Sequence, residues 1–431
     1  MGLGLDFGTT NSSIALVSAS GEVEVAQFPA AAGLTESFRS LLYLERHREA
    51  GRTTIKSWSG PEGIEHYLHS DDKGRLIQSL KSFLASRSLQ TTEVFGRPFR
   101  LEALIARILR DIRAIAEKRF GSDLPPVVVG RPVRFVGAES DEDDEYALYR
   151  LRESLNEAGF SRVSFEFEPV AAAYHYESTL RRDELIVIGD FGGGTSDFSL
   201  LRVGPSFSSA GFSSAGSASR RVLGNQGLGL AGDAFDAKLI RHLVSPALGA
   251  GSQLRSGGKL LPVPNWVYLK LERWHHLSFL KSQDTLNMLT SVARQALEPE
   301  KIKALLYLVR HDLGYQLHRA IQRLKATLSQ EETATFRFDD GDVTIRAGVT
   351  RAQFESWITE ELSAIEDSLD ALLTKTGIAA GEVDRVFLTG GSSFVPSVRR
   401  IFESRFGPEK IRTGDEFTSV ARGLALRSLH R

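Results

Sequence analysis

Two stretches of the sequence, half a chain apart, place an aspartate directly before a turn of glycine and threonine. Asp6 precedes such a turn within residues 3–11, and Asp190 precedes another within residues 186–197. Because glycine has no side chain, several backbone N–H groups of such a turn can face one phosphate. A neighbouring carboxylate suits Mg²⁺, which takes hard oxygen ligands and usually keeps several waters. The two turns therefore predict a site for phosphate groups and a divalent cation.

A third glycine turn strengthens this prediction. The segment of residues 383–389 predicts a strand that enters a turn at Gly390 and Gly391, and Pro396 opens a predicted helix. A single turn of this kind is usually ordinary turn chemistry, whereas the repetition favours a nucleotide site. The turn residues expected to hold phosphates are Gly8, Thr9, Thr10, Gly192, Gly193, Gly194 and Thr195.

The elements around these turns predict a duplicated fold. In each copy a second apolar run follows the turn, at residues 14–17 and 198–203, which predicts a β-hairpin with a polar tip. We expect one such hairpin in each of two lobes, with a cleft between them. Apolar residues at helical spacing predict a helix over residues 101–115, and the acidic residues 139–145 suit the start of a second helix over residues 147–158.

Composition and absent motifs exclude several classes of protein. With 431 residues, 42% of them apolar, and a net charge of -1, the chain is long enough for two lobes and has no global attraction to nucleic acid or acidic membranes. The absence of cysteine excludes disulfides and thiolate zinc sites. No Walker A or Gly-x-Ser-x-Gly sequence is present, which argues against P-loop NTPases and α/β-hydrolases. Without a signal-peptide pattern or a membrane-length apolar run, we expect a cytoplasmic protein that binds neither membrane nor nucleic acid.

Four segments, in order and spacing, resemble the signature of the seventy-kilodalton heat-shock (DnaK-type) chaperones of the actin and hexokinase superfamily. They are residues 6–11, 168–173, 190–197 and 388–393. The resemblance covers nearly the whole chain and is greatest to the short YegD-like members. It implies an α/β, actin-like ATPase fold, with a duplicated two-lobed ribonuclease H-like architecture and ATP or ADP in the central cleft.

The resemblance also implies roles for individual side chains. Lys81 stands where the family has a phosphate-contacting lysine, and Glu168 matches its catalytic-site glutamate. Asp6 and Asp190 would arrange Mg²⁺ and the attacking water, and Asp197 would help to place a monovalent cation such as K⁺. The implied reaction is in-line attack of water on the γ-phosphate, in which positioning and charge neutralisation do most of the catalysis. The implied catalytic residues are Asp6, Lys81, Glu168, Asp190 and Thr195.

On the adenosine side this chain departs from the family pattern. Ala326 stands where a base-stacking arginine is usual, and Phe394 stands where the third turn normally carries an arginine. An aromatic ring can stack on a base, so we expect Phe394 against the adenine, the alternative being a core phenylalanine. Asn11 replaces the usual aromatic residue. The implied nucleotide-binding residues are Gly8, Thr9, Thr10, Asn11, Gly192, Gly193, Gly194, Gly232, Gln322, Lys325, Ser329, Gly390, Gly391, Ser392 and Phe394.

The resemblance predicts the domain organisation. We expect a first lobe at residues 1–183, with 34–124 as its peripheral subdomain, and a second lobe at residues 184–431, with 229–344 as its peripheral, mostly helical subdomain. Full-length DnaK-type chaperones continue into a β-rich peptide-binding domain, and we expect no such domain in this chain.

The helical segment 233–329 is longer than its counterpart in the family, and we expect it to bind a protein partner. Exposed aromatic and aliphatic side chains dominate binding hot spots, although the same residues can form the core of the segment. The candidates are Trp266, Trp274, Leu277, Leu280 and Tyr307.

These observations predict an ATP-binding, slowly ATP-hydrolysing protein that acts as a molecular chaperone or binds a partner according to its nucleotide. Two alternatives belong to other functional classes. A small-molecule, sugar-type kinase of the same superfamily needs a general base beside the acceptor hydroxyl, and no convincing motif for one is present. An actin-like filament or scaffold protein needs self-complementary surfaces, which a sequence does not display.

Overall fold

A computed structural model describes most of the chain, in two compact units. The first unit comprises Met1–Gly229, Asp367–Ser393 and Phe402–Arg431, and the second comprises Leu230–Glu366 and Phe394–Ile401. The described residues are 1–30, 33–49, 52–70, 74–177, 180–208, 222–273, 280, 282–413 and 419–429.

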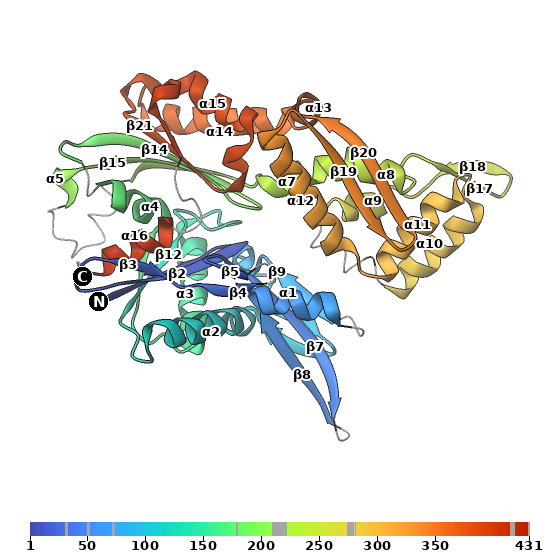
Figure 1. Cartoon of the computed structure of the whole chain (residues 1–431), viewed down its shortest axis with the longest axis horizontal. Helices are drawn as coiled ribbons and strands as arrows, with labels where there is room; N and C mark the ends of the chain where they lie inside the picture. Colours follow the sequence, from blue (N-terminus) through green and yellow to red (C-terminus); the bar gives the residue numbers. More distant parts are fainter. Residues whose placement is uncertain are drawn as a thin grey trace. The chain divides into compact units, whose positions relative to one another are not determined.

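The first unit contains two large sheets that repeat one topology (Figure 1). In the first sheet, β1 (Gly2–Phe7) pairs antiparallel with β2 (Asn11–Val17) and parallel with β12 (Val127–Arg131). In the second, β14 (Glu184–Phe191) pairs antiparallel with β15 (Ser196–Val203) and parallel with β21 (Arg385–Thr389). Outer strands complete the orders β13-β12-β1-β2-β3 and β16-β15-β14-β21-β22. The predicted duplicated hairpin is confirmed.

These outer strands differ in length. Their bounds are β3 (Val23–Val25), β13 (Val163–Phe167), β16 (Val222–Leu228) and β22 (Ile411–Thr413), and β6 (Phe38–Arg39) also pairs with β2.

Residues of β1 alternate between two environments, as a strand requires. Leu3, Leu5 and Phe7 are buried in a core built with helices α2 (Leu101–Phe120) and α3 (Asp141–Glu157). Asp6 has the opposite parity, so its side chain leaves the other face of the sheet. The predicted helix over residues 101–115 is confirmed and continues to Phe120.

Helix α3 begins where its acidic residues favour a helix start. The side chain of Ser140 accepts a hydrogen bond from the backbone N of Asp143, and residues 141–144 place four carboxylates in the first turn. Negative charge at this end complements the helix dipole.

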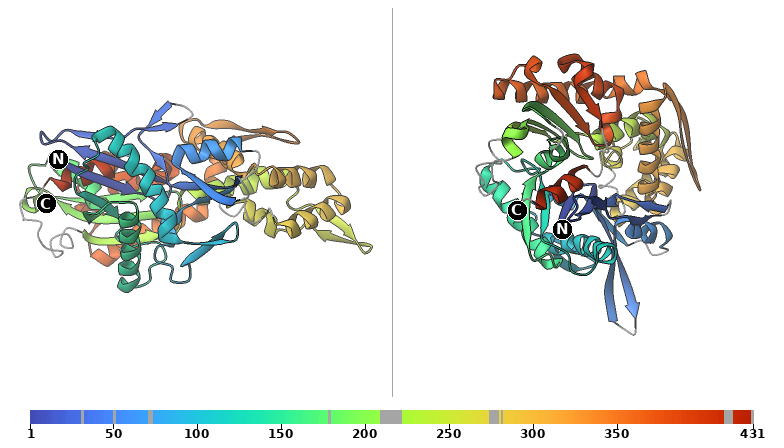
Figure 2. Two further views of the ribbon diagram at one scale, coloured as in Figure 1. Left: turned by 90° about the horizontal axis from the view of Figure 1, so that it is seen from below. Right: turned by 60° about the vertical axis from the view of Figure 1, so that its left-hand side comes forward.

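Two helices lie beside the inner faces of the sheets (Figures 1 and 2). Helix α4 (Glu168–Glu177) packs against strands of both sheets, and α16 (Ser419–Ser428) packs against α4 and the first sheet. Ile186 and Ile188 of β14 share a buried cluster with Val170 of α4. Asp190 has the same parity as these isoleucines, so it also lies on the α4 face. Alternation along the central strands thus directs Asp6 and Asp190 toward the helical layer.

The other face of the second sheet is aromatic. The ring centroids of Phe191 and Phe198 lie 5.9 and 6.0 Å from that of Phe402, which belongs to α15 (Pro396–Phe406). Phe402 itself is fully buried. Burial of three aromatic rings fixes the strand pair that carries Asp190 and Asp197.

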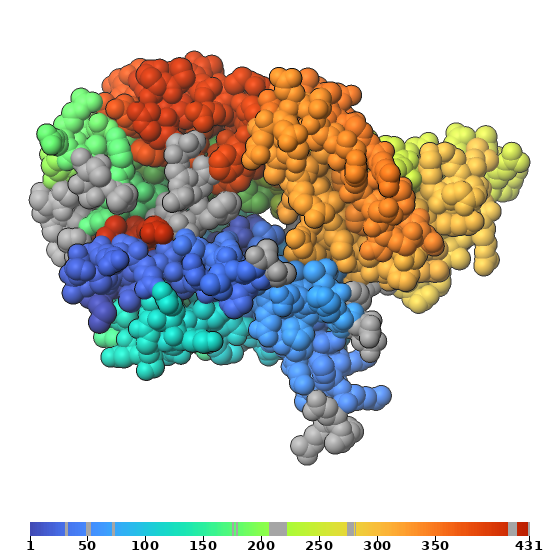
Figure 3. Space-filling view, in the orientation of Figure 1, coloured from blue at the N-terminus to red at the C-terminus, as the bar shows by residue number. Residues whose placement is uncertain are grey.

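Smaller elements complete the first unit. Strands β7 (Leu41–Glu49) and β8 (Arg52–Ser59) form a hairpin that projects from the surface of the first unit (Figure 3). The remaining elements are β4 (Phe28–Ala30), β5 (Gly33–Thr35), α1 (Gly60–His69), β9 (Arg75–Gln78), the 3-10 helix η1 (Leu80–Phe83), β10 (Thr91–Val94), β11 (Arg97–Arg100), α5 (Pro205–Ser208), the C-terminal part of α14 (Thr359–Thr376) and the 3-10 helices η4 (Ala380–Glu382), η5 (Gly391–Phe394) and η6 (Pro408–Lys410). The loop expected over residues 204–218 begins with α5, and residues 209–218 lie outside the described part.

The second unit is mainly helical, as expected for residues 233–329. Its elements are α7 (Gly232–Leu239), the π-helix η2 (Ile240–Val244), α8 (Ser245–Ala247), β17 (Gln253–Ser256), β18 (Lys259–Pro262), α9 (Trp266–Leu271), α10 (Gln283–Gln295), α11 (Pro299–Arg310), α12 (Gly314–Gln330), β19 (Thr333–Asp340), β20 (Val343–Thr350), α13 (Arg351–Trp357) and the N-terminal parts of α14 and α15. The hairpin β17–β18 was not predicted, although the Gly257-Gly258 pair between its strands is a hairpin signal. In neither unit do the described helices include one with the length and apolar character needed to cross a membrane.

Candidate functional site

An ion pair joins two parts of the first unit that are far apart in sequence. Nζ of Lys81, on η1, lies 2.7 Å from Oε1 of Glu168, the first residue of α4. Lys81 is only 7% exposed. Burial by itself lowers the pKa of this lysine, but Glu168 and Asp6 outweigh burial and raise the pKa above its ordinary value. A charged Lys81 on η1 is therefore favoured beside the first residue of α4.

Asp6 and Asp190 occupy equivalent places in the two sheets, near the ends of β1 and β14. Burial, followed by the charge of Glu168, raises the pKa of Asp6 to about 8, although the charge of Lys81 opposes this increase. The pKa of Asp190 is also raised, mainly by burial, although Oγ1 of Thr389 donates a hydrogen bond to its carboxylate over 2.8 Å. Charge on either aspartate is therefore costly in the ligand-free protein.

Asp197 adds a further carboxyl group to this cluster. It lies opposite Asp190 in the β14–β15 register, and Oγ1 of Thr195 donates a hydrogen bond to it over 3.3 Å. Burial, and then the charges of Asp190 and Glu168, raise its pKa to about 7. Four acidic side chains thus share one environment with Lys81. Such an excess of acid fits a bound cation, because a cation would offset the repulsion that raises these pKa values.

Two glycines of the turns beside the cluster, Gly8 and Gly390, have no room for a side chain. A Cβ atom at Gly8 would lie 2.1 Å from the backbone O of Asn11. The N of Gly192 donates to the O of Thr195 over 2.9 Å and closes the second turn. Gly390 has a φ of +83°, and a Cβ there would lie 2.0 Å from the backbone O of Phe191. The third turn therefore packs directly against the strand of Asp190.

A pocket opens beside this cluster in the first unit. Glu168, Asp190, Asp197 and Thr389 are among its polar lining residues, and the side chain of Ile188 contributes to its apolar wall. Within the described ranges, no three His, Asp or Glu side chains are grouped closely enough to hold a metal ion. The metal roles of Asp6, Asp190 and Asp197 remain predictions.

Five of the predicted nucleotide-binding residues belong to the second unit. Gln322, Lys325 and Ser329 lie on α12, where all three are half-buried. Nζ of Lys325 lies 2.7 Å from Oδ1 of Asp236 and donates to the backbone O of Gly232 over 3.1 Å. Sequence reasoning missed Asp236, which is buried. The only indication of its role was its position, one helical turn after Gly232.

Phe394, the fifth of these residues, is 53% exposed. The alternative interpretation of Phe394 as a core residue is therefore wrong. Gly391 is also exposed, whereas Ser392 is buried. Gly390, Gly391 and Ser392 belong to the first unit.

The residues proposed to bind a partner differ in their surroundings. Leu280 is fully buried, so it belongs to the core of the segment and is not available to a partner. Trp266 is 40% exposed, with Nζ of Lys270 located 5.0 Å from its ring centroid. Tyr307 stacks on His311. Trp274 and Leu277 lie outside the described residues.

Comparison with known proteins adds to this geometry. The family model described as Hsp70 protein matches residues 74–250 and 310–429, a range that includes Lys81, Glu168 and Asp190.

Two relatives illustrate the similarity. The chaperone protein DnaK of Thermosipho melanesiensis is 23% identical over 427 residues, covering 99% of this chain and 58% of the relative. The chaperone protein DnaK of Halobacterium salinarum is 24% identical over 438 residues, covering 99% of this chain and 55% of the relative. The chain thus spans a little over half the length of these relatives. Together with the repeated sheet topology, the family match shows that the chain belongs to the Hsp70 protein family and has its actin-like ATPase fold.

Proposed function

We propose that this protein binds ATP and ADP together with Mg²⁺ and hydrolyses ATP slowly. One observation carries the proposal: equivalent hairpins of the two sheets bring Asp6 and Asp190 to the same ion pair, Lys81–Glu168. Membership in the Hsp70 protein family supports it. The raised pKa values of these acids show that burying their charge costs stability, so packing of the sheets does not account for them.

Each part of the site has a proposed role. Asp6 and Asp190 would hold Mg²⁺ and its waters, because they are the carboxylates whose charge a cation would stabilise. The ion would supply neutralisation of phosphate charge. Lys81 would act as a point charge at the terminal phosphates, and Glu168 would fix Lys81 and orient a water. Asp197 and Thr195 would assist beside the second turn, with Asp197 the candidate neighbour of K⁺.

Turnover of ATP by the purified chain tests this proposal. We expect slow release of phosphate that needs Mg²⁺ and does not depend on a sugar. Transfer of phosphate to an added sugar would instead support the kinase alternative, and ATP-dependent sedimentation would support the filament alternative. Absence of both ATP binding and turnover would contradict the proposed function.

The family supports a chaperone-related role in the cytoplasm, and we propose that segment 233–329 provides a site for a protein partner. Large apolar side chains are exposed on β18 and α9 of the second unit, namely Leu260, Leu261, Trp266 and Leu269. Trp266→Ser combined with Leu260→Ser should abolish capture of a partner that distinguishes ATP from ADP. The matched surface variant Leu34→Ser, in the first unit, should capture it normally. Equal capture by both variants would reject this site.

A further inference from the structure

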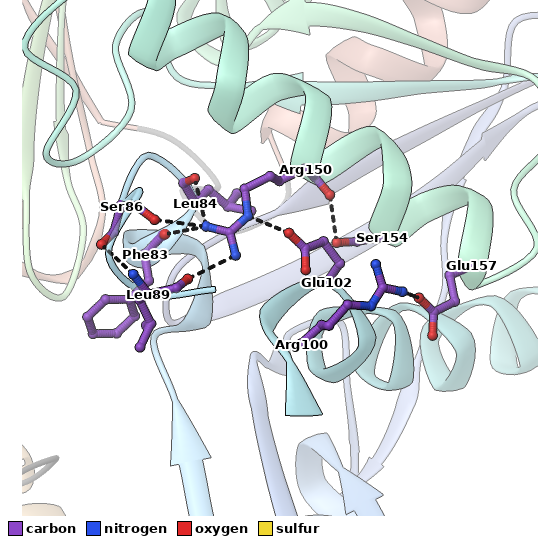
Figure 4. A network of polar contacts seen from close by, with 9 residues as sticks. All are labelled: Phe83, Leu84, Ser86, Leu89, Arg100, Glu102, Arg150, Ser154 and Glu157. Atoms are coloured by element: carbon purple, nitrogen blue, oxygen red, sulfur yellow. Dashed lines mark hydrogen bonds and ion pairs between the residues drawn. The ribbon is translucent and has the colours of Figure 1, made fainter. Parts of the chain in front are cut away.

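Arg150, in the middle of α3, is the largest fully buried side chain of the described part and lies outside the proposed catalytic set. It is 1% exposed, and its Nε donates to Oε1 of Glu102 on α2. Its two terminal nitrogens donate to four backbone carbonyls, one at the end of η1 and three in the loop that follows, as Figure 4 shows. These are the carbonyls of Phe83 and Leu84 at 3.3 Å, of Ser86 at 3.1 Å and of Leu89 at 3.0 Å.

This set of contacts exceeds what a helix-to-helix ion pair requires. Burying a guanidinium costs free energy unless its charge and its N–H groups are compensated, and Glu102 provides the opposite charge. The carbonyls provide the remaining acceptors. Residues 84–89 form neither helix nor strand, so the carbonyls that turn inward, such as the buried one of Leu84, need partners from elsewhere. Arg150 therefore organises this loop as well as neutralising Glu102.

The organised loop continues directly from the turn that carries Lys81. The backbone N of Leu84 donates to the O of Lys81 over 3.2 Å, and the N of Ser86 donates to the O of Phe83 over 3.1 Å. The carbonyls of Phe83 and Leu84, which accept hydrogen bonds from Arg150, thus lie two and three residues after Lys81. A lysine side chain has several rotatable bonds, so the position of its ammonium depends on a fixed backbone.

We propose that Arg150 is a positioning residue for Lys81. Through the carbonyls of residues 83–89 it fixes the backbone that holds the Lys81 ammonium against Glu168. Glu102 is its charge partner, which allows the guanidinium to remain buried. The catalytic part of this inference rests on the proposed ATPase function, whereas the effect on the position of Lys81 does not.

The alternative is that Arg150 only joins α2, α3 and the loop and thereby stabilises the fold. Chemical labelling of Lys81 separates the two cases, because a buried, ion-paired lysine reacts slowly with acylating reagents. We would compare the acylation rate of Lys81 with that of Lys303, whose side chain is 64% exposed, by mass spectrometry. Loss of general stability without movement of the Lys81 backbone would leave this ratio unchanged in the folded protein.

Arg150→Gln removes the charge and most of the donors, and Arg150→Lys keeps the charge opposite Glu102 but cannot reach all four carbonyls. Arg87→Ala is the matched control. Arg87 belongs to the same loop and pairs with Asp143 of α3, but its side chain is 60% exposed. Circular dichroism would establish the temperature at which each variant is folded, and Arg150→Lys decides the test if Arg150→Gln does not fold.

We expect faster acylation of Lys81 in Arg150→Gln, a smaller increase in Arg150→Lys, and no change in Arg87→Ala. ATP turnover should fall by about 10-fold to 10²-fold in Arg150→Gln, the scale of a misplaced catalytic group, with little change in KM. Unchanged acylation of Lys81 in a folded Arg150 variant would overturn the inference. Faster acylation together with a wild-type protein that does not hydrolyse ATP would uphold the positioning of Lys81 and reject the proposed function.

Discussion

Nζ of Lys81 lies 2.7 Å from Oε1 of Glu168, and the same lysine lowers the pKa of Asp6, Asp190 and Asp197 against the opposing effect of burial. Without a ligand, the charge of Lys81 therefore offsets only part of the repulsion among these acidic side chains. Removing an acid relieves repulsion, whereas removing Lys81 increases it. Both changes should impair ATP turnover, but they should change the stability of the ligand-free protein in opposite directions.

Asp190→Asn should reduce ATP turnover by about 10²–10³-fold, the scale for loss of one well-placed electrostatic group. Its free energy of unfolding without ligand should stay equal or rise, because the pKa of Asp190 is raised in the folded protein. Phosphate release and urea unfolding would measure the two effects. Asp339→Asn is the control, since Asp339 is an exposed acid of the second unit. Normal turnover in Asp190→Asn would contradict the role of this carboxylate.

Lys81→Ala should lower both turnover and stability. Removing one partner of a buried ion pair costs about 3 kcal/mol, because the remaining carboxylate is left uncompensated. Lys303→Ala, at an exposed position, should leave the urea midpoint unchanged. A stability of Lys81→Ala equal to that of the wild type would show that the ion pair with Glu168 does not compensate the acidic cluster.

The ligand-free protein should lose stability as pH rises from about 4 to about 8. The pKa of Asp6 is about 8 and that of Asp197 about 7 in the folded protein, both above the ordinary value of 3.8. The folded state therefore binds more protons than the unfolded state in this window, and the free energy of unfolding decreases as these protons are released. Asp6→Asn should flatten the profile. Urea unfolding in the presence of a chelator measures it, and an identical pH profile for the variant would disprove the assignment to Asp6.

Phe394→Ala should weaken ATP binding by roughly 1–2 kcal/mol if the ring stacks on the adenine, on the scale of base–aromatic stacking. The ring is exposed, so the substitution removes little core packing. Phe394→Trp should retain affinity because it keeps an aromatic face. Calorimetric titration with ATP compares the three proteins, and equal affinities would exclude stacking at this position.

Short-range patterns explain what the sequence could predict. A strand, an aspartate, a glycine turn and a second strand lie within a dozen residues, so β1–β2 and β14–β15 were readable from residue order. Strand alternation also determined which face receives Asp6 and Asp190. Helix α2 was readable because its buried residues repeat at helical spacing.

Charge pairs between residues far apart in the sequence are the main feature that the sequence could not predict. Arg150 and Glu102 lie on different helices, and a single charged residue in an amphipathic helix is normally solvated. Asp236 is similar, because its pairing with Lys325 depends on how α7 and α12 pack. Whether Phe394 and Leu280 are buried or exposed could not be predicted either, since an isolated apolar residue fits either core or surface.

Equilibrium binding of ATP to the wild-type protein, with Mg²⁺ and again with a chelator, tests the central claim most directly. Isothermal titration calorimetry should show one ATP per chain, with affinity that falls when Mg²⁺ is removed, because Asp6 and Asp190 then face the phosphates without a cation between them. Asp190→Asn should lose this dependence on Mg²⁺. Failure to bind ATP under either condition, or the same affinity with and without Mg²⁺ in the wild-type protein, would contradict the account.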